Sequence, residues 1–246
     1  MHFSRREIFA DGQRLEVAGH PVRLKVSARA RQISLRVDRV NREVTAVAPT
    51  ARRLADAADF AHQRQAWIAA QLSALPQPQI LDIGDEIGLF GQPCRLETGE
   101  GRARLIAGLD GGPARIVNCG REELDLWMAG RVIRREADRV FAERVRHHCG
   151  ALGAPLPSVK TADATGRWGS CTPARAERRA AIRLSWRLAL APFEVADYVV
   201  AHEVAHLKEA NHGPRFWALV HDLVGDPKPH RAWLRTEGPR LHAFGR

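Results

Sequence analysis

Two histidines four residues apart, with a glutamate directly after the first, constrain this chain more than any other feature of its sequence. The residues are His202, Glu203 and His206. On an α-helix, residues four apart are rotated by about 40° and displaced by roughly 6 Å, so both imidazoles leave one face and can share a metal ion. Glu203 then lies near the open position of that ion, where its carboxylate can take a proton from an attacking water. We therefore expect a helix here, and its valines and alanines indicate that it is buried.

A catalytic zinc site needs a third protein ligand and a vacant position, and His212 is the best candidate for that ligand. An unbroken helix would rotate His212 by about 240° relative to His206, so the helix has to end first. Asn211 tolerates the left-handed conformation in which helices end, and Gly213-Pro214 cannot extend a helix smoothly. The chain can therefore turn here and bring His212 back to the ion.

Three acidic residues are alternatives to His212 as the third ligand. Glu209 returns to nearly the same helix face as His202, but an axial offset of about 10 Å is too long for a shared ion, which excludes it. Asp222 and Glu237 stay open as carboxylate ligands from later segments.

Strand patterns dominate the first half of the chain. Between Pro21 and Pro49, apolar and polar residues alternate in three runs, which is the period of half-buried strands. Residues 51–75 repeat apolar positions at helical spacing until Pro76 stops them. Residues 83–117 hold short apolar runs between glycines, which predicts hairpins, with Asp110-Gly111-Gly112 as the clearest turn.

The second half opens with the longest helical pattern, from Arg121 to Gly150. Short strands are expected at 158–163, 167–172 and 182–187, with helices at about 192–210 and 213–224. The predicted fold class is α+β, with a β-rich region at residues 1–120 and a metal-dependent hydrolase domain at 121–246. The pattern leaves open whether these halves are separate domains or share one core.

Charge and composition restrict the partners and the compartment. The net charge of +10 favours polyanions, and residues 1–50 hold ten basic and five acidic residues, so a nucleic acid is a candidate partner of that part. The first twenty residues are charged throughout, which fits neither a signal peptide nor a transmembrane helix. We therefore expect a cytoplasmic protein without a membrane partner.

Several motifs resemble those of the YgjP-like metallopeptidases, a bacterial group related to the SprT-like, M48-type and other zincin hydrolases. They are Arg167-Trp-Gly-Ser-Cys171, Leu184-Ser-Trp-Arg-Leu188, Asp197-Tyr-Val-Val-Ala-His-Glu203, Asn211-His212, Phe216-Trp217 and a strand signature from Arg29 to Val37. The resemblance covers about Val22 to Leu241. It implies a zincin-type domain, zinc on His202, His206 and His212, and Glu203 as the catalytic acid/base. A nucleotide-hydrolysing role on triphosphates such as UTP is also attached to the group.

The segment Arg167-Trp168-Gly169 is the candidate substrate-binding strand. Zincin clefts commonly bind a peptide as an added strand, and Gly169 permits a close backbone approach. Trp168 either lines the cleft or belongs to the core. Tyr198, one turn before His202, either stabilises an oxyanion or is simply buried.

Three functions are consistent with these sequence features. A zinc peptidase needs an open cleft with a free strand edge. A nucleoside triphosphate pyrophosphohydrolase needs arginines such as Arg167, Arg183 or Arg187 to clamp the phosphates. A nucleic-acid-binding protein with a structural metal is the third, although a structural site is usually closed by four protein ligands. We expect the peptidase, acting on a peptide or protein, with nucleotide hydrolysis as the alternative.

Overall fold

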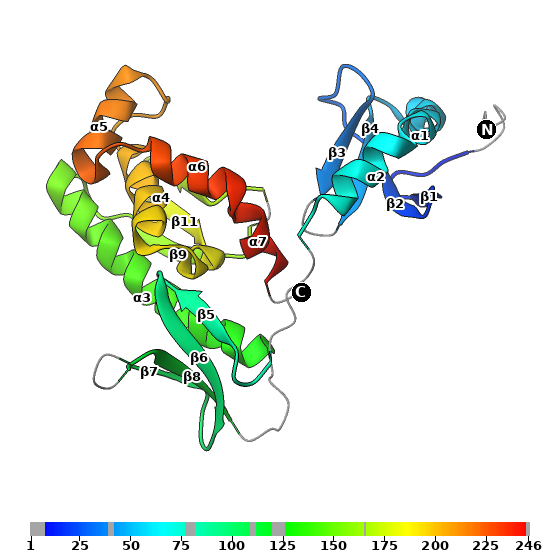
Figure 1. The fold of residues 1–246 in the computed structure, drawn as a ribbon. Helices are drawn as coiled ribbons and strands as arrows, with labels where there is room; N and C mark the ends of the chain where they lie inside the picture. The colour runs from blue at the N-terminus through cyan, green and yellow to red at the C-terminus, as the bar shows by residue number, and fades with distance from the viewer. Residues whose placement is uncertain are drawn as a thin grey trace. The chain divides into compact units, whose positions relative to one another are not determined.

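The chain forms two compact units, Met1–Gln77 and Pro78–Arg246 (Figure 1). The computed structural model describes residues 8–38, 42–76, 82–108, 112–119, 126–164 and 166–244. The sequence predicts a boundary between the two halves near Gly120. Gly120 lies outside the described residues, and the described segments before and after it both belong to the second unit. The α+β fold class is confirmed, since strands and helices occur in both units.

The first unit is a four-stranded sheet with two helices on one face (Figure 1). Its strands are β1 (Arg14–Val17), β2 (His20–Val26), β3 (Ser34–Asp38) and β4 (Glu43–Ala48), in the order β1-β2-β4-β3. The three runs of alternating residues thus form β2, β3 and β4, whereas β1 was not predicted. The helical pattern at 51–75 is divided into a short 3-10 turn, α1 (Leu54–Gln63) and α2 (Gln65–Ser73), with a break at Arg64.

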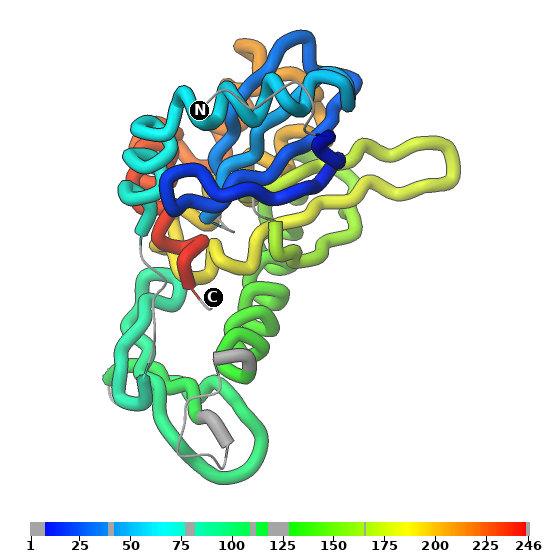
Figure 2. The backbone as a smooth tube through the Cα atoms, turned by 90° about the vertical axis from the view of Figure 1, so that its right-hand side faces the viewer, coloured from blue at the N-terminus to red at the C-terminus, as the bar shows by residue number. Residues whose placement is uncertain are grey.

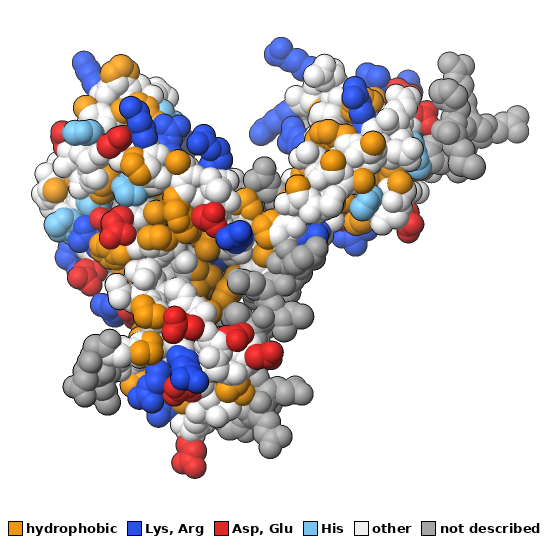
Figure 3. All heavy atoms as spheres, in the orientation of Figure 1, with side chains coloured by type: hydrophobic (Ala, Val, Ile, Leu, Met, Phe, Trp, Pro, Cys, Tyr) orange, Lys and Arg blue, Asp and Glu red, His pale blue; other side chains and the backbone are white. Residues whose placement is uncertain are grey.

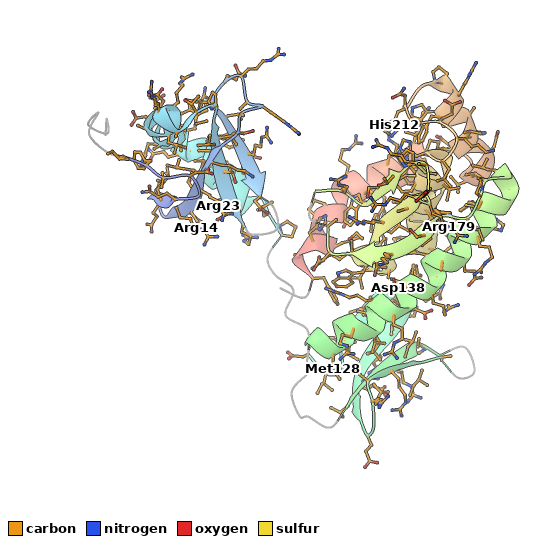
Figure 4. All side chains as sticks on the ribbon, turned by 180° about the vertical axis from the view of Figure 1, so that it is seen from behind. Arg14, Arg23, Met128, Asp138, Arg179 and His212 are labelled. Carbon is orange, nitrogen blue, oxygen red and sulfur yellow. The ribbon has the colours of Figure 1, made fainter. Side chains whose placement is uncertain are left out.

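The period-two pattern of this sheet separates an apolar face from a charged one. Val22, Leu24, Val44 and Ala46 are fully buried and pack in one cluster with the helices. On the opposite face the pairing register aligns Arg14, Arg23, Thr45 and Arg36 across the four strands. Glu43 pairs there with Arg14 at 3.1 Å and Arg23 at 3.8 Å, and these two arginines lie together in Figure 4.

The second unit begins with another four-stranded sheet, in the order β5-β6-β8-β7. Its strands are β5 (Glu86–Leu89), β6 (Gln92–Gly99), β7 (Arg104–Ile106) and β8 (Ala114–Cys119). The predicted hairpins are present as the antiparallel pairs β5–β6 and β7–β8. Most of the predicted turn at 110–112 lies outside the described residues.

A long helix connects this sheet to the rest of the unit. Helix α3 (Leu126–Leu152) runs from the β5–β8 sheet to a three-stranded sheet ordered β10-β11-β9 (Figures 1 and 2). The strands are β9 (Ser158–Ala162), β10 (Gly169–Thr172) and β11 (Ala181–Ser185), and the β10–β11 connection projects from the unit in Figure 2. One apolar cluster includes Leu96, Ile116, Ile133, Phe141 and Leu184, so both sheets and α3 share a core.

The remaining elements pack around a buried helix. A 3-10 helix (Trp186–Leu190) leads into α4 (Phe193–Ala205), which is followed by α5 (Pro214–Val224), α6 (Lys228–Thr236) and α7 (Gly238–Ala243). Helices α6 and α7 were not predicted. Among the described residues, no helix has both the length and the apolar character needed to cross a membrane.

Candidate metal centre

Helix α4 positions two of the three predicted ligands. Nearly every residue of this helix is buried, including Val199, Val200 and Val204, while His202 remains half-buried and opens toward a cleft. The helix ends at Ala205, about five residues earlier than predicted, and His206 caps it. The predicted helix at these residues is confirmed, but its predicted C-terminal end near residue 210 is wrong.

The turn after α4 returns the chain to the same face. The backbone amides of Lys208 and Glu209 both donate to the Ala205 carbonyl at 3.0 Å, and Gly213 donates to the Asn211 carbonyl at 2.7 Å. Helix α5 then begins at Pro214, which needs no amide hydrogen there. As a result His212 faces His202, with their Nε2 atoms 3.1 Å apart.

The three imidazoles form a group that could hold one metal ion. One nitrogen from each of His202, His206 and His212 lies within 4.8 Å of the others, and Figure 4 marks the position of His212. Within the described part of the chain no further cluster of three such ligand types occurs, and neither Asp222 nor Glu237 belongs to this one.

The surroundings of these rings suit metal binding. The side chain of Phe216 is fully buried, and its ring centre lies 4.5 to 4.8 Å from the centres of all three imidazoles. His206 Nδ1 lies 3.0 Å from the Glu209 carbonyl oxygen, so the Nδ1–H donates there and leaves Nε2 free for an ion. Glu209, which the helix geometry excludes as a ligand, thus orients the His206 ring through its backbone carbonyl.

Burial also keeps two of these histidines, His202 and His206, neutral. It lowers the pKa of His202 to about 4, with smaller contributions from His206, His212 and Arg231. Burial likewise lowers the pKa of His206. Because a metal binds the neutral imidazole, these two rings could accept an ion at neutral pH without losing a proton.

Glu203 lies beside this group in an apolar setting. Its side chain is buried, and burial raises its pKa to about 7, although the positive charge of Arg167 opposes the shift. A Cβ atom added at Gly169 of β10 would lie 2.5 Å from the Glu203 Oε1 atom. Gly169 therefore allows the strand to pass directly over the carboxylate, a contact that the sequence alone did not predict.

A cleft runs between β10 and the histidines. It is lined by Arg167, Gly169, Ser170, Cys171, Pro173, His202, Glu203, His206, Ala210 and His212. Strand β10 is at the edge of its sheet and pairs with β11 on one side only among the described strands. The cleft thus combines a free strand edge, a carboxyl group and three imidazoles.

The predicted substrate segment is divided between two surroundings. Arg167 and Gly169 line the cleft with the histidines, whereas Trp168 stacks on His242 with ring centres 4.4 Å apart. Trp168 also packs against a small cluster that includes Ala191 and Leu241. Tyr198 is buried and stacks on His230, and burial raises its pKa.

A partly buried ion-pair network joins α4 to α3. The Asp197 carboxylate accepts hydrogen bonds from Arg144 at 2.7 and 2.9 Å, and His148 Nε2 lies 2.8 Å from it. Burial alone would raise the pKa of Asp197, but the bonds from His148 and Arg144 outweigh this and lower it. A charged residue within an apolar helix was the only sequence signal for this link between α3 and α4.

The other two candidate phosphate-binding arginines do not reach the cleft. Arg187 is almost fully buried, pairs with Asp163, and lies 4.4 Å above the Trp186 ring. Arg183 is exposed on β11 and is not among the residues that line the cleft with the histidines.

A comparison with models of protein families identifies a family for this chain. A family model described as "YgjP-like, metallopeptidase domain" matches residues 31–237, which is most of the chain. No curated protein and no solved structure matches this chain.

Proposed function

Because the chain belongs to the YgjP-like family of metallopeptidase domains, we propose that it is a zinc-dependent peptidase with Glu203 as its general base. The observation that carries this proposal is the convergence of three imidazoles beside a buried carboxyl group, in a cleft with a free strand edge.

The donor set favours zinc among the common metals. Three imidazole nitrogens with an open fourth position are typical of catalytic zinc sites. His202, His206 and His212 would hold the ion, which would act as a Lewis acid and lower the pKa of a coordinated water. Phe216 and the Glu209 carbonyl would fix the ring orientations.

Glu203 would move the proton during hydrolysis. Its carboxylate would accept a proton from the water that attacks the peptide carbonyl, and would then pass it to the leaving nitrogen. A pKa of about 7 suits both steps, because the group can gain and lose a proton near neutral pH.

The edge of β10 would position the substrate. An extended peptide that pairs with Gly169–Thr172 would lie in the cleft beside Glu203, with main-chain hydrogen bonds supplying the orientation. Arg167 is exposed, lines this cleft and would contact acidic or polar groups of the substrate. The buried, paired state of Arg187 lends no support to the nucleotide alternative.

The test compares the wild type with Glu203→Gln, both loaded with zinc, on an unfolded protein substrate and on a panel of nucleotides. We expect the variant to retain its zinc and to lose about 10²- to 10⁴-fold in peptide turnover. Full activity of the variant would contradict the role of Glu203. Glu203-dependent release of pyrophosphate from UTP, without peptide cleavage, would replace the peptidase by the nucleotide hydrolase.

A further inference from the structure

The first unit has a free strand edge of its own. In the sheet order β1-β2-β4-β3, strand β3 pairs with β4 on one side, and no described strand pairs with its other side. Native sheets usually protect such edges, because the unpaired amides and carbonyls accept any extended chain. An edge left open is therefore a candidate site for strand addition.

An apolar groove lies directly beside this edge. Its volume is about 310 Å³, and its walls are Ile33, Ser34 and Leu35 from the strand side and Phe60, Arg64 and Trp67 from the helices. Trp67 is 40% exposed, one of few large apolar side chains on the described surface. Figure 3 shows such apolar patches on this unit next to Lys and Arg side chains. Trp and Arg are among the residues that are enriched where proteins bind partners.

The two faces of β3 differ in a way that specifies the ligand. Leu35 of β3 and Ile33, which directly precedes the strand, contact the apolar core on the helix side, whereas Arg36 is exposed on the opposite face. No ion pair within the described residues involves Arg36 or Arg64, and the Arg64 guanidinium lies 5.6 Å from the Phe60 ring centre. An added strand would place alternate side chains in the groove and beside Arg36.

We propose that β3 and this groove bind an extended polypeptide segment in which apolar residues alternate with acidic ones. Its backbone pairs with β3, its apolar side chains enter the groove beside Trp67, and its acidic side chains lie beside Arg36. A folded helix or a duplex nucleic acid does not offer this alternation. The identity of this segment rests on the proposed peptidase function. If that function holds, the segment is part of a protein substrate, and β3 with its groove is a second binding site for that substrate, apart from the cleft beside Glu203.

The test measures binding with metal-free, full-length protein, so that hydrolysis plays no part. The probe is a fluorescein-labelled peptide of alternating Leu and Asp residues, followed by fluorescence anisotropy. We expect saturable binding that weakens at least about tenfold in Trp67→Ser and in Arg36→Glu. The matched control Arg52→Glu, at an exposed arginine of the same unit, should bind as the wild type does.

Two further probes distinguish strand addition from other modes. Methylation of every second peptide nitrogen should abolish binding when the methylated nitrogens are those that face β3. Methylation of the other set, which faces away from β3, should leave binding unchanged. A peptide of alternating Leu and Lys should bind far more weakly. The proposal is overturned if the Leu–Asp peptide does not bind, if Trp67→Ser binds it equally well, or if labelled single-stranded DNA binds in its place and depends on Trp67. The binding assay contains no metal and measures no cleavage. A failure to detect peptidase activity in a separate assay would therefore refute the proposed function without changing the binding result.

Discussion

The carboxyl group of Glu203 is controlled by burial more than by its charged neighbour. Burial raises its pKa from 4.5 to about 7, and the opposing charge of Arg167 is too exposed to reverse this. The same apolar setting lowers the pKa of His202 to about 4. One environment thus favours a neutral imidazole at His202 and a carboxyl group at Glu203 that titrates near neutrality.

The raised pKa predicts a pH dependence of stability in the metal-free protein. Between pH 4.5 and 7 the unfolded carboxyl group of Glu203 loses its proton while the folded one keeps it, so the folded state loses stability as the pH rises. The total effect is about 3 kcal/mol. Urea unfolding of metal-free wild type and Glu203→Gln across this range measures it. Parallel pH curves for the two proteins would contradict the assigned pKa.

Gly169 is predicted to set the position of Glu203. A Cβ atom at this residue would lie 2.5 to 2.8 Å from three atoms of the carboxylate side chain, so Gly169→Ala has to displace it. A shift of about 1 Å at a catalytic group costs on the order of 10²-fold in rate. We expect that loss in turnover with normal zinc content. Gly130→Ala on α3, which has open space at that position, is the control and should be fully active.

At the scale of elements, periodicity predicted most helices and strands but not where every one begins and ends. Alternation located β2, β3 and β4, and helical spacing located α3 and α4. Helix α4 ends at Ala205, where the amides of Lys208 and Glu209 share the Ala205 carbonyl. Strand β1 forms through its pairing with β2. Neither feature is visible in the local periodicity of the sequence. The contact of Gly169 with Glu203 joins β10 to α4, and no spacing rule connects segments so far apart.

The link between α3 and α4 is predicted to be a major source of stability in the second unit. Asp197→Asn would leave Arg144 without its carboxylate and remove the charged acceptor of the buried His148. Breaking such a buried pair costs about 3 kcal/mol. Glu143→Gln, which alters an exposed pair with Arg139, should change the free energy of unfolding by less than about 0.5 kcal/mol. Equal effects of the two substitutions in urea unfolding would refute this difference.

At the scale of the whole molecule, each unit has a hydrophobic core of its own. The core of the first unit contains Val22, Leu24 and Ile68, and that of the second joins Leu96 and Ile116 to α3. The sequence changes character near residue 120, because hairpins give way to a long helix there. Periodicity shows which face of an element is buried but not which element covers it, so the shared core of β5–β8 and α3 could not be inferred.

Separate cores predict separate responses to metal. Zinc at 100 times its dissociation constant stabilises the unit that binds it by about 2.7 kcal/mol. Since all three imidazoles belong to the second unit, only residues 78–246 should gain protection. Hydrogen-exchange mass spectrometry in urea, with and without a chelator, resolves the two units. Equal zinc-dependent protection in residues 1–77 would contradict independent unfolding.

In the proposed function, His202, His206 and His212 hold the single ion on which peptide hydrolysis depends. Titration of the metal-free protein with zinc, while cleavage of an unfolded protein substrate is followed, tests it most directly. We predict no cleavage without zinc, a linear rise to one zinc per chain and a plateau beyond it, with His212→Ala remaining near the baseline over the same range. Cleavage by the metal-free protein, a plateau at another ratio, or no cleavage at saturating zinc would contradict the claim.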